Sequence, residues 1–315
     1  MKKRSVVLVT MLMIMVGSLF AQAPNPASDF QYSLNRAGNG VVITKYTGTG
    51  TTVNIPSKIE GFPVVEIGNS DNRAFASSRI TSVIFPDTDI IIGTGAFSGS
   101  SLTSVTLPNT IKDIGTNAFA GCGELQTVTI NMSVSDRNWN PSGIFGSCTN
   151  LRTVTFTSSW VIIPSGMFNS CRRLATIVFP DNLKIIGDGA FANTDLDLNR
   201  IILPEGIEEI RSDAFQVRVR YGSPRVTETL TLPEGLHTIG ENAFRDKKIN
   251  KLVLPSTITT IHDQAFYLTG ITEVIIPESV TRISFPSRGY PPFSGLRLNL
   301  QSQAALRRVG YTGSL

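Results

Sequence analysis

The chain has 315 residues, and its 28 Lys and Arg outnumber its 24 Asp and Glu to give a formal net charge of +4. Lys2, Lys3 and Arg4 supply three of these four charges, so the remainder of the chain is nearly neutral. A dedicated nucleic-acid-binding protein needs a broad basic face, and this charge balance argues against one.

The first 23 residues have the organisation of a secretory signal peptide. A basic start at residues 2–4 is followed by an apolar segment at residues 6–20 and a cleavage sequence at residues 21–23. The apolar segment is shorter than the roughly 20 residues that a membrane-spanning helix needs. We therefore expect an exported chain with no stable membrane span after removal of residues 1–23; a retained signal anchor is the alternative.

Residues 29–75 have the pattern of an N-terminal capping unit. Residues 41–43 and 53–56 are predicted strands, and the Gly-Thr-Gly sequence at residues 48–50 separates them. The unit is longer than those that follow, as expected of an end unit that must cover an exposed core.

A phenylalanine recurs every 22 to 29 residues along the rest of the chain. A period in the twenties, with apolar residues in constant phase, is typical of a leucine-rich repeat solenoid. We therefore predict one repeat domain over residues 76–295, whose stacked coils bury a continuous core along a spine of phenylalanines. The ten positions are Phe75, Phe97, Phe119, Phe145, Phe168, Phe191, Phe215, Phe244, Phe266 and Phe293.

The coil over residues 102–122 illustrates the expected local structure. Leu102, Val105 and Leu107 are predicted to point inward from a short strand, and the strands of successive coils to stack into a parallel sheet. Pro108 ends the strand because it has no N–H to donate. A polar residue three positions before most of the phenylalanines is predicted to cap a short helical turn opposite the sheet. A glycine such as Gly115, just before this position, is predicted to form the turn into it.

The sequence Leu-x-x-Val-x-Leu-Pro at residues 102–108, followed by Ile-x-x-Ile-Gly-x-x-Ala-Phe-x-x-Cys at residues 111–122, resembles the BspA-like leucine-rich repeat family. The closing segment at residues 309–315 is similar to the end of spirochaete members. The resemblance covers roughly residues 40–315 and implies a right-handed repeat solenoid on or outside the bacterial cell. It also implies that members bind varied partners, including host matrix proteins, epithelial cells and other bacteria. The family has no catalytic motif to carry over.

The cysteines and histidines give no sign of a catalytic or metal site. Cys122, Cys148 and Cys171 all lie three residues after a spine phenylalanine, where other repeats have Ser or Thr. A buried column of small side chains is the favoured interpretation, and a disulfide between neighbouring coils is the alternative. His237 and His262 fall at different phases of the repeat, which argues against a shared metal ion. We expect no enzymatic activity and no cofactor.

One candidate recognition surface is the outward face of the predicted strands. The residues two before the proline phase should align into one stripe, and a Thr-rich sheet with Val and Ile suits a protein partner. Good strand propensity on a solvated face explains the same residues equally well. We call them the outer stripe: Ile84, Thr106, Thr129, Thr155, Val178, Ile202, Thr231, Val253 and Ile275.

A second candidate is the insertion at residues 216–226, where Val and Arg alternate before a Gly-Ser-Pro turn and predict a protruding hairpin. Arg218, Arg220, Tyr221 and Arg225 would engage an acidic partner, because Arg and Tyr are favoured as interface anchors. A tolerated surface insertion without a function is the alternative.

Residues 301–309 are predicted to form a short helix within a C-terminal cap over residues 296–315. Together these observations predict an exported, non-enzymatic binding protein that recognises a protein ligand, for example a host matrix or cell-surface protein, and acts in adhesion. The expected location is secreted, at the cell surface or periplasmic. A structural or scaffolding protein of the bacterial envelope is the alternative.

Overall fold

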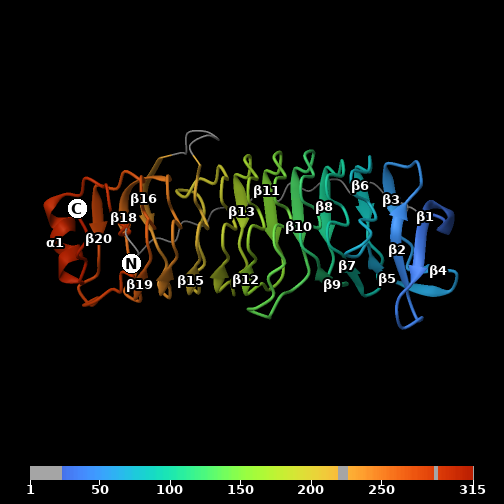
Figure 1. Ribbon diagram of the computed structural model, residues 1–315, viewed down its shortest axis with the longest axis horizontal. Coiled ribbons are helices and arrows are strands. Elements are labelled where there is room, and N and C mark those ends of the chain that lie inside the picture. Colours follow the sequence, from blue (N-terminus) through green and yellow to red (C-terminus); the bar gives the residue numbers. More distant parts are fainter. Residues whose placement is uncertain (1–22, 219–225, 287–289, 315) are drawn as a thin grey trace, which may run out of the picture.

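The computed structural model describes residues 23–218, 226–286 and 290–314. They form a long solenoid of stacked coils that runs from the N-terminal strands to the C-terminal helix (Figure 1). Coils contribute short strands to two opposite long faces, so strands more than twenty residues apart in sequence become neighbours. The predicted leucine-rich repeat solenoid with stacked parallel strands is confirmed.

The first long face, which we call the strand face, carries the predicted strands. Its parallel sheets are β3–β6, β8–β10–β11–β13 and β16–β18–β20. The inward residues pair in register from coil to coil: Val105 pairs with Val128, which pairs with Val154. The strands are β3 (Thr52–Asn54), β6 (Ser82–Ile84), β8 (Ser104–Leu107), β10 (Thr127–Ile130), β11 (Thr153–Phe156), β13 (Thr176–Val178), β16 (Val226–Thr231), β18 (Lys248–Val253) and β20 (Glu273–Ile275).

The opposite face is built from shorter strands and is interrupted once. The coil over residues 131–145 forms only an isolated bridge there, between Val134 and Trp160. In this stretched coil Trp139 is half-buried, and its ring meets that of Trp160 edge-on at 5.3 Å. The strands of this face are β5 (Phe62–Ile67), β7 (Ile90–Ile92), β9 (Ile111–Ile114), β12 (Ile162–Ile163), β14 (Ile185–Ile186), β15 (Glu209–Ile210), β17 (Thr238–Ile239) and β19 (Thr260–Ile261).

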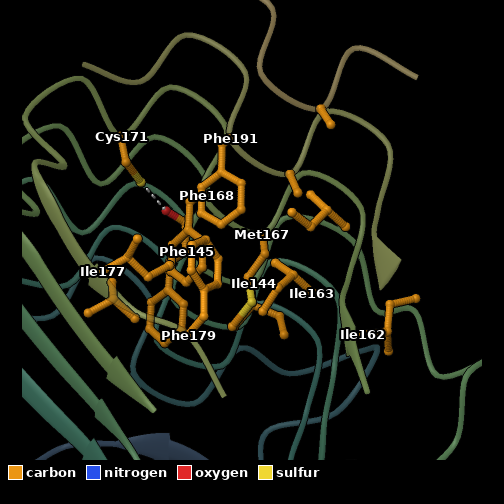
Figure 2. Close-up of a cluster of buried hydrophobic side chains, with 14 of the residues drawn as sticks. Ile144, Phe145, Ile162, Ile163, Met167, Phe168, Cys171, Ile177, Phe179 and Phe191 are labelled. Atoms are coloured by element: carbon orange, nitrogen blue, oxygen red, sulfur yellow. Dashed lines mark hydrogen bonds between the residues drawn. The ribbon is translucent and has the colours of Figure 1, made fainter. Parts of the chain in front are cut away.

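The spine of phenylalanines forms the centre of the core between the two faces. Each ring from Phe75 to Phe293 lies 4.8–5.8 Å from the next, centroid to centroid, and within 18° of parallel. All ten side chains are fully buried. Figure 2 shows Phe145, Phe168 and Phe191 following one another in this column. The sequence prediction of a continuous core along these residues is therefore confirmed.

The segments that contain the phenylalanines differ from the predicted helical turns: they are double bends. Residues two before and two after most of the phenylalanines have φ between 52° and 76°, as Asn117 and Gly121 do around Phe119. Left-handed residues cannot belong to a right-handed helical turn. The N–H groups of Asn117, Phe119 and Gly121 instead donate to carbonyl oxygens of the next coil, each at 2.8 Å. The polar residues therefore lead into a bend and do not cap a helix.

The glycines before these bends serve close packing of the backbone. Gly115 does not have a positive φ, so it is not required for a left-handed turn. A Cβ atom at Gly115 would lie 2.5 Å from the backbone nitrogen of Thr94 in the preceding coil, and one at Gly93 would lie 2.3 Å from the carbonyl oxygen of Gly68. Only glycine lets adjacent coils approach this closely.

The two ends of the solenoid depart from the repeat. At the N-terminal end, a 3-10 helix (Ala27–Asp29) leads into β1 (Phe30–Leu34), which pairs antiparallel with β2 (Val41–Tyr46), while β4 (Lys58–Ile59) pairs antiparallel with β5. At the other end the predicted helix is present as α1 (Leu300–Arg308). The Ser302 hydroxyl accepts a hydrogen bond from the N–H of Val274 at 2.8 Å and so fastens α1 to β20.

The division of the chain into a cap over residues 29–75, repeats over 76–295 and a cap over 296–315 stays a prediction. The predicted signal peptide lies outside the described residues, except for Ala23. In the part of the chain that the structure describes, no helix is long and apolar enough to cross a membrane.

Candidate recognition face

The outer stripe is aligned by strand pairing. Thr129 pairs in register with Thr106 on one side and Thr155 on the other, and Thr155 pairs with Val178. Farther along the solenoid, Val253 pairs with Thr231 and with Ile275. Because side chains alternate along a strand, these residues point away from the core that their neighbours fill. Strand pairing thus brings seven of the nine outer-stripe residues together in two groups, whereas Ile84 lies in the separate sheet of β3 and β6 and Ile202 lies in no strand.

Large apolar side chains on this stripe are exposed to solvent. The exposed fraction of the residue is 87% for Ile202, 51% for Val178, 40% for Ile84 and 39% for Ile275. Thr106 is also exposed, whereas Thr129, Thr155 and Val253 are half-buried between their neighbours. Of the eleven large hydrophobic residues that are exposed in the described ranges, four lie on the outer stripe.

The predicted stripe is interrupted at Ile202. The segment that contains it forms no strand: one sheet of the strand face ends at β13, and the next begins at β16. The sequence predicts that Ile202 aligns with Val178, because it lies two residues before Pro204. Ile202 is indeed exposed, as this position in the repeat requires. The strand is missing because the backbone just before Ile202 folds back on Asp197, whose carbonyl oxygen accepts from the N–H groups of Arg200 and Ile201 at 2.9 and 3.3 Å.

The insertion is only partly within the described residues. Arg218 is exposed, and its backbone N–H donates to the side-chain oxygen of Asn193 at 2.9 Å. Arg220, Tyr221 and Arg225 lie outside the described residues. Val226 begins β16, which pairs in parallel with β18.

The three cysteines are free thiols buried inside the solenoid. Each Sγ donates to the carbonyl oxygen of a spine phenylalanine in the preceding coil, at 3.1–3.2 Å. Figure 2 shows this contact for Cys171. Burial raises the pKa of the Cys171 thiol to about 12, which keeps it protonated at neutral pH. The buried column of small side chains that the repeat phase predicted is present, and no disulfide joins Cys122, Cys148 and Cys171.

The same column contains a residue that the sequence interpretation overlooked. Lys247 lies three residues after Phe244, at the phase of the cysteines, and only 3% of it is exposed. Its Nζ donates to the carbonyl oxygen of Leu196 at 3.4 Å, two coils away. Burial lowers the pKa of Lys247 from 10.5 to about 8, and the negative charges of Asp195 and Asp197 oppose this shift. The phase of Lys247 was the available signal that it would be buried.

Nothing in the described residues resembles a metal centre. In residues 23–218, 226–286 and 290–314 no group of three or more His, Cys, Asp or Glu side chains is placed to hold a metal ion. His237 is exposed and His262 is half-buried, on different coils.

Several solved structures are similar to this chain. Among solved structures, the chain is similar to a leucine-rich repeat protein of T. pallidum, with 22% identity, a TM-score of 0.39 and coverage of 93% of this chain and 98% of that one. It is also similar to a leucine-rich cell surface protein of Faecalibacterium prausnitzii, with 25% identity, a TM-score of 0.48 and coverage of 82% and 78%. The pneumococcal vaccine antigen PcpA shares 19% identity, with a TM-score of 0.43 and coverage of 88% and 82%.

A search of curated protein sequences finds no match. The sequence profile of the BspA type leucine-rich repeat region matches six copies, over residues 68–197, 138–219 and 196–286. These ranges span more than half of the chain and contain most of the spine phenylalanines. The chain belongs to the BspA-type leucine-rich repeat family.

Proposed function

We propose that this protein is an exported, non-enzymatic binding protein that recognises a protein partner through its strand face and acts in adhesion at the bacterial surface. The observation that carries the proposal is the concentration of exposed aliphatic side chains on the outer stripe. Ile84, Val178, Ile202 and Ile275 come from four coils, yet stacking brings them to one surface.

Exposed aliphatic side chains on a rigid sheet are suited to binding. The apolar area is removed from water when a partner covers it, which contributes roughly 25 cal/mol for each Å². Ile84, Val178 and Ile275 are held by strand pairs, so little conformational entropy is lost there on binding. A stripe that spans several coils suits an extended or flat protein surface better than a small molecule. Export is supported by the composition of residues 1–23, which have the three regions of a signal peptide.

The partner is identified by capture. The mature chain, immobilised through its C-terminus, is exposed separately to host matrix proteins and to an extract of the bacterial envelope. Capture from the host matrix supports adhesion; capture from the envelope extract alone contradicts it and supports a scaffolding role. Protease treatment of intact cells then tests surface location, since a periplasmic protein is protected.

The face is tested with the captured ligand. The variant Thr106→Lys/Thr129→Lys/Thr155→Lys places three charges on paired strands without touching the core. We expect its affinity to fall by at least about tenfold, as for changes at interface centres. Unchanged affinity for the captured ligand would contradict recognition through the strand face.

Two control variants accompany this measurement. Ile91→Lys carries a charge on the opposite face, where the side chain is 41% exposed, and should leave the affinity unchanged. The variant Arg218→Ser/Arg220→Ser/Arg225→Ser tests the insertion. Loss of binding in this variant, with normal binding of the threonine variant, would assign recognition to the insertion instead.

A further inference from the structure

The interruption of the strand face at Ile202 coincides with a local hollow. β13 is the last strand of its sheet, and β16 is the first strand of the next. The intervening segment turns on Asp197: its carboxylate accepts from the N–H of Asn199 at 3.0 Å, and its carbonyl oxygen accepts from the next two N–H groups. In the described residues, no backbone hydrogen bond joins β13 to residues 199–204. The coils are thus not joined here by strand pairing, as they are within each of the three sheets of the strand face.

The β16 side of this interruption is closed by a side chain. The amide of Asn199 donates to the carbonyl oxygen of Val226 at 2.8 Å and accepts from the N–H of Glu228 at 3.1 Å. A residue of a parallel strand would make the same two contacts with its backbone. Asn199 therefore completes the edge of β16, and the space that remains lies on the β13 side.

That space is a hollow with a volume of about 390 Å³. Its apolar lining includes Val178 and Ile202, which are the two most exposed aliphatic residues of the outer stripe. Asp181 and Glu205 also line it, and each directly follows the proline that ends its repeat's strand position. Within each sheet of the strand face, strand pairing places the outer-stripe residues of neighbouring coils side by side. The hollow lies where β13 has no strand partner in the next coil.

The charges around the hollow are unbalanced toward the negative. Asp181 and Glu205 are exposed, and within the described part of the chain their carboxylates have no ion pair or hydrogen bond. Arg200 also lines the hollow, but its Nε pairs with Asp197 at 3.4 Å. The hollow therefore presents two unpaired carboxylates beside two exposed aliphatic side chains.

We propose that this hollow binds a segment of the protein partner in which Lys or Arg alternates with aliphatic residues. The basic side chains would pair with Asp181 and Glu205, and an aliphatic side chain would pack between Val178 and Ile202. Complementary charge gives specificity and speeds association, while the buried apolar contact supplies affinity. This inference rests on the proposed function and adds the chemistry of the partner.

The test uses a fluorescein-labelled peptide of alternating Lys and Val as the probe and measures its anisotropy with the full mature chain. We expect saturable binding at one site, weakened by salt because the carboxylates are exposed. A peptide of alternating Glu and Val should not bind, and one of alternating Lys and Ser should bind more weakly. Absence of binding by the Lys-Val peptide would refute the proposal.

Matched variants locate the site. Asp181→Asn/Glu205→Gln removes two charges from the hollow, and Asp87→Asn/Glu278→Gln removes two exposed charges at the same repeat phase in other coils. We expect the first variant to weaken peptide binding at least about tenfold and the second less than about twofold. Ile202→Ser should weaken it by a similar factor to the first variant. Equal weakening by the two charge variants would show general attraction to an acidic surface and overturn the proposal.

The same variants separate this inference from the proposed function. If the captured protein ligand is lost with the threonine variant but binds the hollow variants normally, the strand face recognises the ligand and the hollow does not. Light scattering after gel filtration provides the other distinction. A dimer that disappears in Asp181→Asn/Glu205→Gln would show that the occupant is a second copy of this chain, against the partner proposed here.

Discussion

Lys247 is the most informative residue to perturb, because it carries an ammonium group inside a column of small side chains. Lys247→Met keeps the length and apolar character of the side chain and removes the charge. In the described part of the chain, the only hydrogen bond of Nζ is the long one to the carbonyl oxygen of Leu196. The charges of Asp195 and Asp197 help to retain the ammonium form, but burial has the larger effect on the pKa.

The magnitude follows from the pKa of Lys247. Folding lowers it from 10.5 to about 8, and one pKa unit corresponds to about 1.4 kcal/mol. Folding the charged form therefore costs about 3 kcal/mol at neutral pH. Between pH 8 and 10.5 the unfolded chain binds the proton and the folded chain does not, so stability rises with pH in this window. Below pH 8 both states are protonated and the cost is constant.

We expect Lys247→Met to be about 1–3 kcal/mol more stable than the wild type at pH 7, since replacing a buried charge by an apolar side chain is often stabilising. The difference should shrink by about 2–3 kcal/mol between pH 7 and pH 10, because the wild-type lysine loses its charge there. Urea unfolding at both pH values measures it. Lys248→Met, at the exposed neighbouring position, is the control and should show no such trend. A pH-independent difference for Lys247→Met would refute the reasoning.

Three further predictions concern packing. Phe119→Ala should lower the free energy of unfolding, measured in urea, by about 3–5 kcal/mol. Phe62→Ala, at a position that is 40% exposed, should lower it by less than about 1 kcal/mol. Equal losses in the two variants would contradict the role of the stacked spine. Gly115→Ala should lower the free energy of unfolding by about 1–3 kcal/mol, because the added methyl overpacks the space between coils. Gly123→Ala, where a Cβ meets nothing within 4 Å, should leave the stability nearly unchanged. Unchanged stability of Gly115→Ala would show that the coils can separate. Labelling of native thiols by a maleimide should be slow and should become fast in urea, because burial blocks access; rapid native labelling would contradict the buried positions of Cys122, Cys148 and Cys171.

Repeat phase explains why so much of the fold was predictable. Each coil is too small to bury its own apolar face, so a residue that recurs at one phase must meet its equivalents in the neighbouring coils. Phe119 and Val105 could therefore be assigned to the core without knowledge of distances. The same logic placed the cysteines in one buried column, and it would have placed Lys247 there had its phase been compared.

Local chemistry was a poorer guide to the bends. A polar residue shortly before Ala-Phe resembles a helix N-cap, and Gly115 resembles a turn residue. Both interpretations considered one coil alone. In the stack, the N–H of Phe119 finds its acceptor in the next coil, and the close approach of Thr94 requires a glycine. Hydrogen bonds between coils replaced those that a helical turn would make.

The candidate recognition face, too, was predictable only in part. Which residues face outward was predictable from the sequence, since alternation along a strand and the repeat phase place Val178 and Ile202 at equivalent positions. The absence of a strand at Ile202, and the place of Asn199 at the edge of β16, became visible only in the folded chain. These features depend on contacts between side chains and backbone up to 29 residues apart, and no periodic pattern in the sequence encodes such contacts.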